Sequence, residues 1–228
     1  MNIIFLMKPI INVNAKTKTW IFYLISFLFG SVLMGVEMLG SRMMAPYFGT
    51  DIFVWANIIG IVLLAVSIGN FFGGKLSNRN NILFIITVIS IILLLYIAFF
   101  YKPIFKWISN WFTAEIIEHG QPQSYSDKII KPLSASIIVF LPLIFCLSMF
   151  TPIFIHRLSV SLEDTGKVSG RVYAVSTIGN LFGTFFTSFF LIVRYDTLTT
   201  FYIFFAVFVV NLIIIFIFGL DKTKYEKS

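Results

Sequence analysis

The stretch SIGNFFGG at residues 67–74 lies at the end of one long apolar run, and STIGNLFGT at residues 176–184 lies inside another. The two stretches share the phrase Ile-Gly-Asn, followed in both by a large apolar residue, phenylalanine and glycine. Weak internal similarity between apolar segments is typical of membrane folds that are built from structural repeats. The order of the apolar runs around the two copies therefore decides the fold.

The composition indicates an integral membrane protein. Hydrophobic residues make up 58% of the 228 residues and charged residues 12%, whereas an ordinary soluble domain has about 45–50% and about 25%. The mean hydropathy is +0.94. Continuous apolar runs of about 20 residues favour membrane-spanning helices over a β-barrel. We expect spans at residues 20–40, 53–73, 82–101, 137–155, 172–193 and 198–219.

The segments between the expected spans are short, except for one loop. We expect an N-terminal segment at residues 1–19, a six-helix membrane domain at 20–219, an outer loop at 102–135 and a tail at 220–228. Most of the 17 Lys and Arg residues fall on the side of the two termini, which predicts cytoplasmic termini and location in the cell inner (plasma) membrane. Apolar residues at helical spacing predict an interfacial helix in the outer loop. They are Ile104, Phe105, Ile108, Trp111, Phe112 and Ile116.

Three expected spans precede the outer loop and three follow it, and each copy of the phrase lies in the second span of its trio. Because each trio has an odd number of helices, the second trio enters the membrane in the opposite orientation. Inverted three-helix repeats of this kind build the halves of major facilitator transporters. The expected fold is therefore all-α, with six helices in two inverted repeats, equivalent to half of a major-facilitator-like fold.

Small residues recur at one-turn spacing in both copies of the phrase, and such seams let two helix backbones approach closely. Asn70 and Asn180 lie beside the seams. They either hydrogen-bond a neighbouring helix or form a pseudo-symmetric pair of ligand contacts. The seam residues are Ala65, Gly69 and Gly73 in the first copy and Gly179, Gly183 and Thr187 in the second.

Charged residues in or near the spans are candidates for a site. Glu37 lies deep in the first span, where an ionised side chain is costly and usually faces the bundle interior. Arg42 is its nearest candidate partner in the sequence. Arg171, at the head of the fifth span, either extends to the membrane surface or points inward. Together with Asn70 and Asn180, these three residues are the expected lining of a central cavity.

No pattern in the sequence indicates bond-making chemistry. Nucleotide-binding glycine loops and nucleophile elbows are missing. His119 and His156 are far apart in the sequence, and Cys146 is the single cysteine. We therefore expect no catalytic residue, no metal site and no cofactor. The net charge of +7 is dispersed over the loops, which predicts the lipid bilayer rather than nucleic acid as the partner.

Two stretches resemble a known family. The residues VEMLGSRMMAPYFGTDIFVWANIIGIVLLAVSIGNFFGGKL (36–76) and TGKVSGRVYAVSTIGNLFGTFFTSFFLI (165–192) are similar to the membrane domain of the membrane-bound spermidine synthase-like proteins, also described as fused major facilitator/spermidine synthase. Relatives commonly continue into a cytoplasmic aminopropyltransferase domain that binds decarboxylated S-adenosylmethionine and putrescine. The catalytic aspartates and nucleotide-binding glycines of that domain have no counterparts here, so we expect no enzymatic activity from this chain by itself. The signature pieces are Glu37-Met38, Arg42, Ala45-Pro46, Phe48-Gly49, Val54-Trp55 and Gly170 to Thr184.

The loop GGKLSNRN at residues 73–80 resembles the Gly-x-Leu-x-Asp-Arg loop of major facilitator proteins. Gly74, Leu76 and Arg79 match, and Asn78 stands where that loop has aspartate. The carboxylate that would pair with a basic residue or a helix end is therefore missing from the loop.

Two functions follow from these features. The resemblance implies a membrane anchor or subunit that partners a separately encoded, soluble aminopropyltransferase. The alternative is a major-facilitator-type transporter or binding protein for a small molecule, with a cationic polyamine as the ligand that an interior acid would suit. Six helices could also form half of a working unit and pair into a homodimer.

Overall fold

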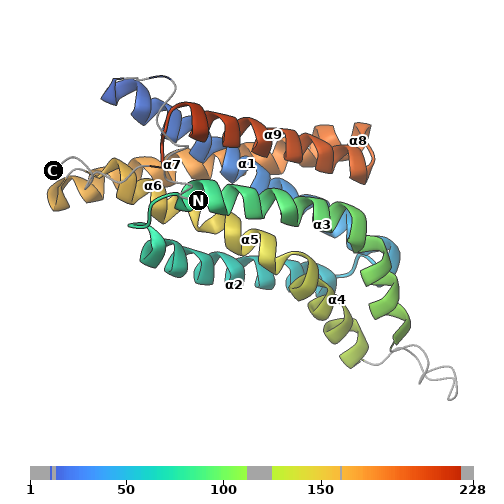
Figure 1. Cartoon of the computed structure of the whole chain (residues 1–228). Helices are drawn as coiled ribbons and strands as arrows, with labels where there is room; N and C mark the ends of the chain where they lie inside the picture. Colours follow the sequence, from blue (N-terminus) through green and yellow to red (C-terminus); the bar gives the residue numbers. More distant parts are fainter. Residues whose placement is uncertain (1–10, 12–13, 112–124, 160, 222–228) are drawn as a thin grey trace, which may run out of the picture.

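Six long helical spans run side by side through the computed structural model (Figure 1). The structure describes residue 11 and residues 14–111, 125–159 and 161–221. All six spans are long and apolar enough to cross a membrane, which confirms the expected all-α, multi-pass fold. The described helices are α1 (Ala15–Phe48), α2 (Ile52–Leu76), α3 (Ile82–Trp111), α4 (Tyr125–Val139), α5 (Leu141–Ser148), α6 (Phe150–Leu158), α7 (Leu162–Phe186), the π-helix η2 (Thr187–Leu191), α8 (Ile192–Arg194) and α9 (Thr197–Ile217).

Short polar residues begin four of the helices. The side chain of Asn14 accepts a hydrogen bond from the backbone N–H of Thr17, 2.8 Å away, at the start of α1. Asp51, Ser161 and Asp196 cap α2, α7 and α9 in the same way. These side chains satisfy N–H groups that have no partner within the helix, so each helix begins before or at the edge of its apolar run.

The fourth span is interrupted, because prolines remove hydrogen bonds from it. Pro142 has no N–H to donate to the carbonyl of Ile138, and Pro152 has none for the carbonyl of Ser148. The chain accordingly divides into α4, α5 and α6. The expected single run at residues 137–155 thus consists of three helical pieces, and α5 with α6 makes up the apolar span itself.

Residues 102–111, where we expect an interfacial helix, are helical and continue α3. Buried aromatic packing explains the continuation. Phe105, which is fully buried, makes edge contacts with the rings of Tyr47 and Phe48 at the end of α1. Of the rest of the expected loop, residues 125–135 belong to α4, and Phe112 and Ile116 lie outside the described residues.

The fifth span is longer than expected and changes its winding near one end. It begins at Leu162, ahead of the apolar run at 172–193, because Ser161 caps α7 in the preceding polar stretch. After Phe186 the helix widens into η2, which is followed by α8.

The most extensive contacts between spans form three pairs. The helix α1 packs along α7, α2 packs along α4, α5 and α6, and α3 packs along α9. The first span thus pairs with the fifth, the second with the fourth and the third with the sixth. If each span is replaced by its counterpart in the other trio, the same three pairs result, as expected for two related repeats. The colours of Figure 1 also show that α2 and α7, which carry the two copies of the phrase, run in opposite directions.

Both glycine seams lie against the first span of the other repeat. A Cβ atom at Gly69 would lie 2.4 Å from the carbonyl oxygen of Phe145 in α5. One at Gly183 would lie 2.1 Å from the carbonyl oxygen of Ser31 in α1. Side chains larger than hydrogen have no room at these positions, so the repeated phrase provides close helix packing between the repeats. Gly73 and Gly179 have equally close contacts, and Ala65 and Thr187 are buried.

Candidate functional site

A cleft of about 320 Å³ lies between α2 and α7, with α1, α5 and α6 forming the rest of its wall. It combines residues of both repeats, because α1 and α2 belong to the first trio and α5 to α7 belong to the second. The polar lining residues are Glu37, Asn70, Ser148, Thr151, Tyr173, Ser176, Thr177 and Asn180, and the apolar ones are Leu33, Met34, Ile59, Val62, Leu63 and Val66.

Asn70 and Asn180 face the cleft from equivalent positions. Each directly follows a seam glycine, Gly69 or Gly179, so the turn that packs the glycine against a neighbour also places the amide at the cleft. The Oδ1 atoms of both residues are buried and have no hydrogen-bond partner among the described residues. Buried amide oxygens are normally bonded. The seams therefore serve packing, and the amides beside them keep unused hydrogen-bonding capacity.

Glu37 lines the same cleft from α1. The residue is 7% exposed, between the core residues Val36 and Leu39. No hydrogen bond or ion pair joins it to any described residue. An unpaired carboxyl group inside a membrane span is costly, and such groups commonly mark a pathway or a ligand site.

Arg42 and Arg171 do not belong to this site. The Nη1 atom of Arg42 donates to the carbonyl oxygens of Ile192 and Tyr195, the latter 3.0 Å away. The expected pairing of Arg42 with Glu37 is therefore wrong, because the guanidinium binds the backbone where η2 and α8 end. Arg171 is exposed on α7, and neither arginine is among the cleft-lining residues. Three of the five expected cavity residues come together, and two do not.

Several polar residues of the cleft were missed by the sequence reasoning. Ser148, Thr151, Ser176 and Thr177 lie in apolar runs, where serine and threonine commonly bond to their own helix and carry no distinctive signal. Tyr173 falls within the family-like stretch but had no assigned role. The one available signal is position, because Ser176 and Thr177 stand immediately before the second copy of the repeated phrase.

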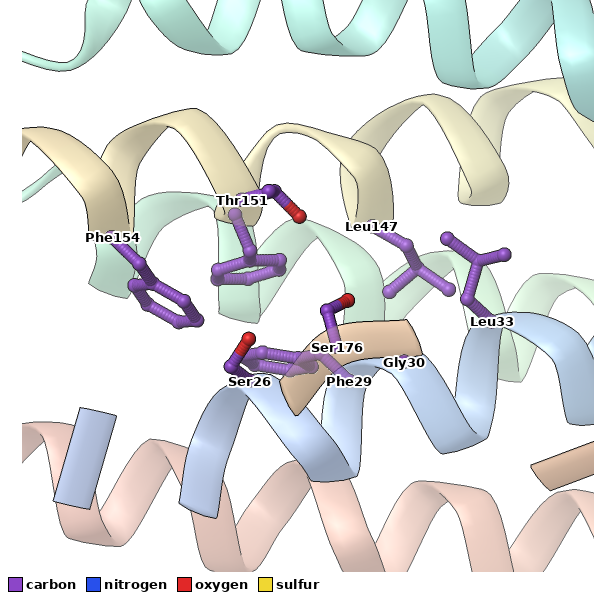
Figure 2. Close-up of a pocket in the computed structure, with 9 residues that line it drawn as sticks. Ser26, Phe29, Gly30, Leu33, Leu147, Thr151, Phe154 and Ser176 are labelled. Atoms are coloured by element: carbon purple, nitrogen blue, oxygen red, sulfur yellow. The ribbon is translucent and has the colours of Figure 1, made fainter. Parts of the chain in front are cut away.

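A second, smaller cavity of about 20 Å³ shares lining residues with the cleft. Figure 2 shows the residues that surround it. Ser26 of α1, Thr151 of α6 and Ser176 of α7 contribute hydroxyl groups to it. Thr151, Ser176 and Leu33 line the cleft as well. The rest of its wall is apolar and includes the aromatic rings of Phe29, Phe150 and Phe154.

A buried ion pair lies at the end of the bundle where α3 begins. Both carboxylate oxygens of Asp221 accept backbone hydrogen bonds of 3.0 Å, from the N–H groups of Leu83 and Phe84. The Nη2 atom of Arg157 lies 3.5 Å from Asp221 Oδ1 and donates to the carbonyl oxygen of Arg79, 2.8 Å away. Burial raises the pKa of the Asp221 carboxyl, and these bonds oppose the rise. Asp221, which follows α9, thus pairs with a basic residue and bonds the start of α3.

Comparisons of the chain with known protein families, curated proteins and solved structures find no match. The resemblance to the spermidine synthase-like membrane domain therefore stays a prediction, as does the partnership with a soluble aminopropyltransferase. Within the described ranges, no three His, Cys, Asp or Glu side chains come together as a metal site.

Proposed function

We propose that this chain is a membrane-embedded module that binds and transports a small organic cation in the cleft between α2 and α7. The observation that carries the proposal is the Glu37 carboxyl group, buried and unpaired among the described residues, at the wall of that cleft. A positively charged ligand would supply the partner that no described residue supplies.

The other lining groups fit the same class of ligand. The amides of Asn70 and Asn180 offer hydrogen-bond donors and acceptors, and rotation of an amide exchanges its oxygen with its nitrogen. Val62, Val66 and Met34 provide an apolar wall for an alkyl chain. The volume of about 320 Å³ lies at the lower end of small-molecule sites, which are about 300–1,000 Å³. A short alkylamine or diamine, the class that includes the polyamines, matches this combination.

The location of the cleft also supports transport. Substrate sites of repeat-built transporters lie at the repeat interface, and alternating access comes from one repeat moving against the other. This cleft takes its two amides from equivalent positions of opposite repeats. We place the chain in the cell inner membrane with both termini in the cytoplasm, on the basis of its distribution of Lys and Arg.

The cleft opens to the side of the six-helix bundle, which supports a homodimer. Leu63 on α2 and Tyr173 on α7 are 64% and 48% exposed at its edges. A groove that contains a carboxyl and two amides is unfavourable against lipid, where polar groups lack partners. A second copy of the chain, with its own cleft facing this one, would cover the groove and complete the site.

Uptake into proteoliposomes tests the proposed transport. We expect the wild-type protein to exchange internal putrescine for labelled external putrescine, and Glu37→Gln to abolish exchange while the protein elutes as the wild type does in size-exclusion chromatography. Glu163→Gln, which removes an exposed carboxylate in the first turn of α7, is the matched control and should leave exchange unchanged. Wild-type exchange of putrescine and of butylamine no faster than in protein-free liposomes would refute the proposal.

A further inference from the structure

Some hydroxyl groups in the spans bond to their own helix, and others have no partner among the described residues. In Ser31, Thr87 and Thr184 the hydroxyl donates to a carbonyl of the same helix, at 2.8, 2.7 and 2.9 Å. The hydroxyls of Ser26, Thr151 and Ser176 have no partner among the described residues, although Ser26 is only 3% exposed. These three come from three different helices and surround the same small cavity (Figure 2).

The small cavity fits one water molecule. Its volume is about 20 Å³, and a buried water needs about 10–15 Å³ and two to four polar partners. Three hydroxyl groups supply those partners. A metal cation is a poorer occupant, because none of the described residues that line the cavity is acidic and could balance its charge.

The small cavity adjoins a row of polar groups that lines the cleft. Thr151 and Ser176 belong to both the cavity and the cleft. Along the cleft, Asn180 lies between these hydroxyls and Glu37, because its Oδ1 atom lies beside Gly30, two turns from Glu37 along α1. In the other direction Tyr173 lies nearer the end of the bundle at which α7 begins.

We propose that Glu37 exchanges protons with the side of the membrane on which α1 and α7 begin, through water in the cleft and in the small cavity that the hydroxyls of Ser26, Thr151 and Ser176 surround. In the forward step a hydronium ion in the cleft gives its proton to the carboxylate and becomes water, and the reverse step returns the proton. The purpose of this exchange rests on the proposed function, since protonation of Glu37 would release a bound cation.

Few charged groups compete with Glu37 for this role. Among the described residues that line the cleft, Tyr173 is the one titratable side chain besides Glu37. Arg42, on the same helix as Glu37, is bonded to backbone carbonyls, and Arg171 on α7 is exposed. Proton exchange in the cleft therefore centres on Glu37.

Infrared spectroscopy tests the proposal without any transported ligand. The C=O stretching band of a protonated carboxyl shifts when deuterium replaces its hydrogen. The band that Glu37→Gln removes is assigned to Glu37, and its shift is followed in time after dilution of the reconstituted protein into D₂O. We expect Ser176→Ala and Thr151→Val to slow the shift about fivefold, the effect of losing one hydrogen bond along the route.

Ser31→Ala is the matched control, because the Ser31 hydroxyl bonds to Phe27 on its own helix and does not line the cleft. It should exchange at the wild-type rate. The proposal is overturned if no carboxyl band disappears in Glu37→Gln at any pH at which the protein stays folded, or if the Ser176 and Thr151 variants exchange as fast as Ser31→Ala. Either result would leave the proposed cation binding intact. If the wild-type protein exchanges no putrescine but the Ser176 and Thr151 variants slow the infrared shift as expected, the transport proposal alone is refuted.

Discussion

Gly179 of α7 lies directly against the carbonyl oxygen of Phe27 in α1, so that a Cβ atom on Gly179 would lie 2.2 Å from that oxygen. The contact partner is backbone, which cannot rotate away as a side chain does. The equivalent glycine of the first repeat, Gly69, would bring a Cβ atom within 1.9 Å of Ser148 Oγ and 2.4 Å of a carbonyl oxygen. The two repeats are thus held together by a matched pair of backbone contacts.

Alanine at these glycines should destabilise the bundle. We expect Gly179→Ala to lower the free energy of unfolding by about 1–3 kcal/mol, the usual cost of overpacking. Gly170→Ala, in the same helix, has no atom within 4 Å of the new Cβ, and should stabilise by up to about 1 kcal/mol through helix propensity. Reversible unfolding in sodium dodecyl sulfate measures both, and equal stability of the two variants would contradict the close packing of α1 and α7.

The fold was largely predictable from the sequence, because its signals are local. Apolar runs determine the spans. The repeated Ile-Gly-Asn phrase marks α2 and α7, the helices whose glycines pack against the other repeat. The breaks in the fourth span have an equally local cause in Pro142 and Pro152, although the helix bounds depend on packing. The continuation of α3 was not predictable, since it depends on contacts of Phe105 with the distant end of α1.

The candidate site was predictable in part. Glu37, Asn70 and Asn180 carry a signal because polar residues stand out in an apolar run. Arg42 carries the same signal, yet it binds carbonyls that only the end of η2 and α8 brings within reach. Asp221, by contrast, carries no signal in the sequence, because it lies outside every expected span. Its hydrogen bonds to the start of α3 depend on the folded structure.

Asp221 and Arg157 should be coupled energetically. We expect Asp221→Ala to destabilise by about 3–5 kcal/mol, because it leaves a buried guanidinium without its ion pair and frees two backbone N–H groups. Removing both charges in Asp221→Ala with Arg157→Leu should cost less than the sum of the two single changes. A double-mutant cycle by chemical unfolding measures the coupling, and strict additivity would show that the pair contributes nothing.

Cysteine cross-linking tests the proposed homodimer. The native Cys146 is buried, so it provides little background reaction. We expect Leu63→Cys, at the exposed edge of the cleft, to form a disulfide-linked dimer in membranes treated with a mild oxidant. Phe99→Cys on α3 is similarly exposed but does not line the cleft, and it should stay monomeric. Equal cross-linking of the two variants would indicate random collision instead of a defined interface.

The two amides should contribute equally to ligand binding, since they occupy equivalent positions in the repeats. We expect Asn70→Ala and Asn180→Ala each to weaken putrescine binding by about five- to tenfold, as the loss of one hydrogen bond implies. Asn211→Ala is the matched control, because Asn211 is a buried span amide with an unpaired Oδ1 that does not line the cleft. Isothermal titration calorimetry of the reconstituted protein measures the three affinities. If Asn211→Ala weakens putrescine binding as much as Asn70→Ala does, the amides affect binding only by stabilising the fold. The cleft would then not be the ligand site.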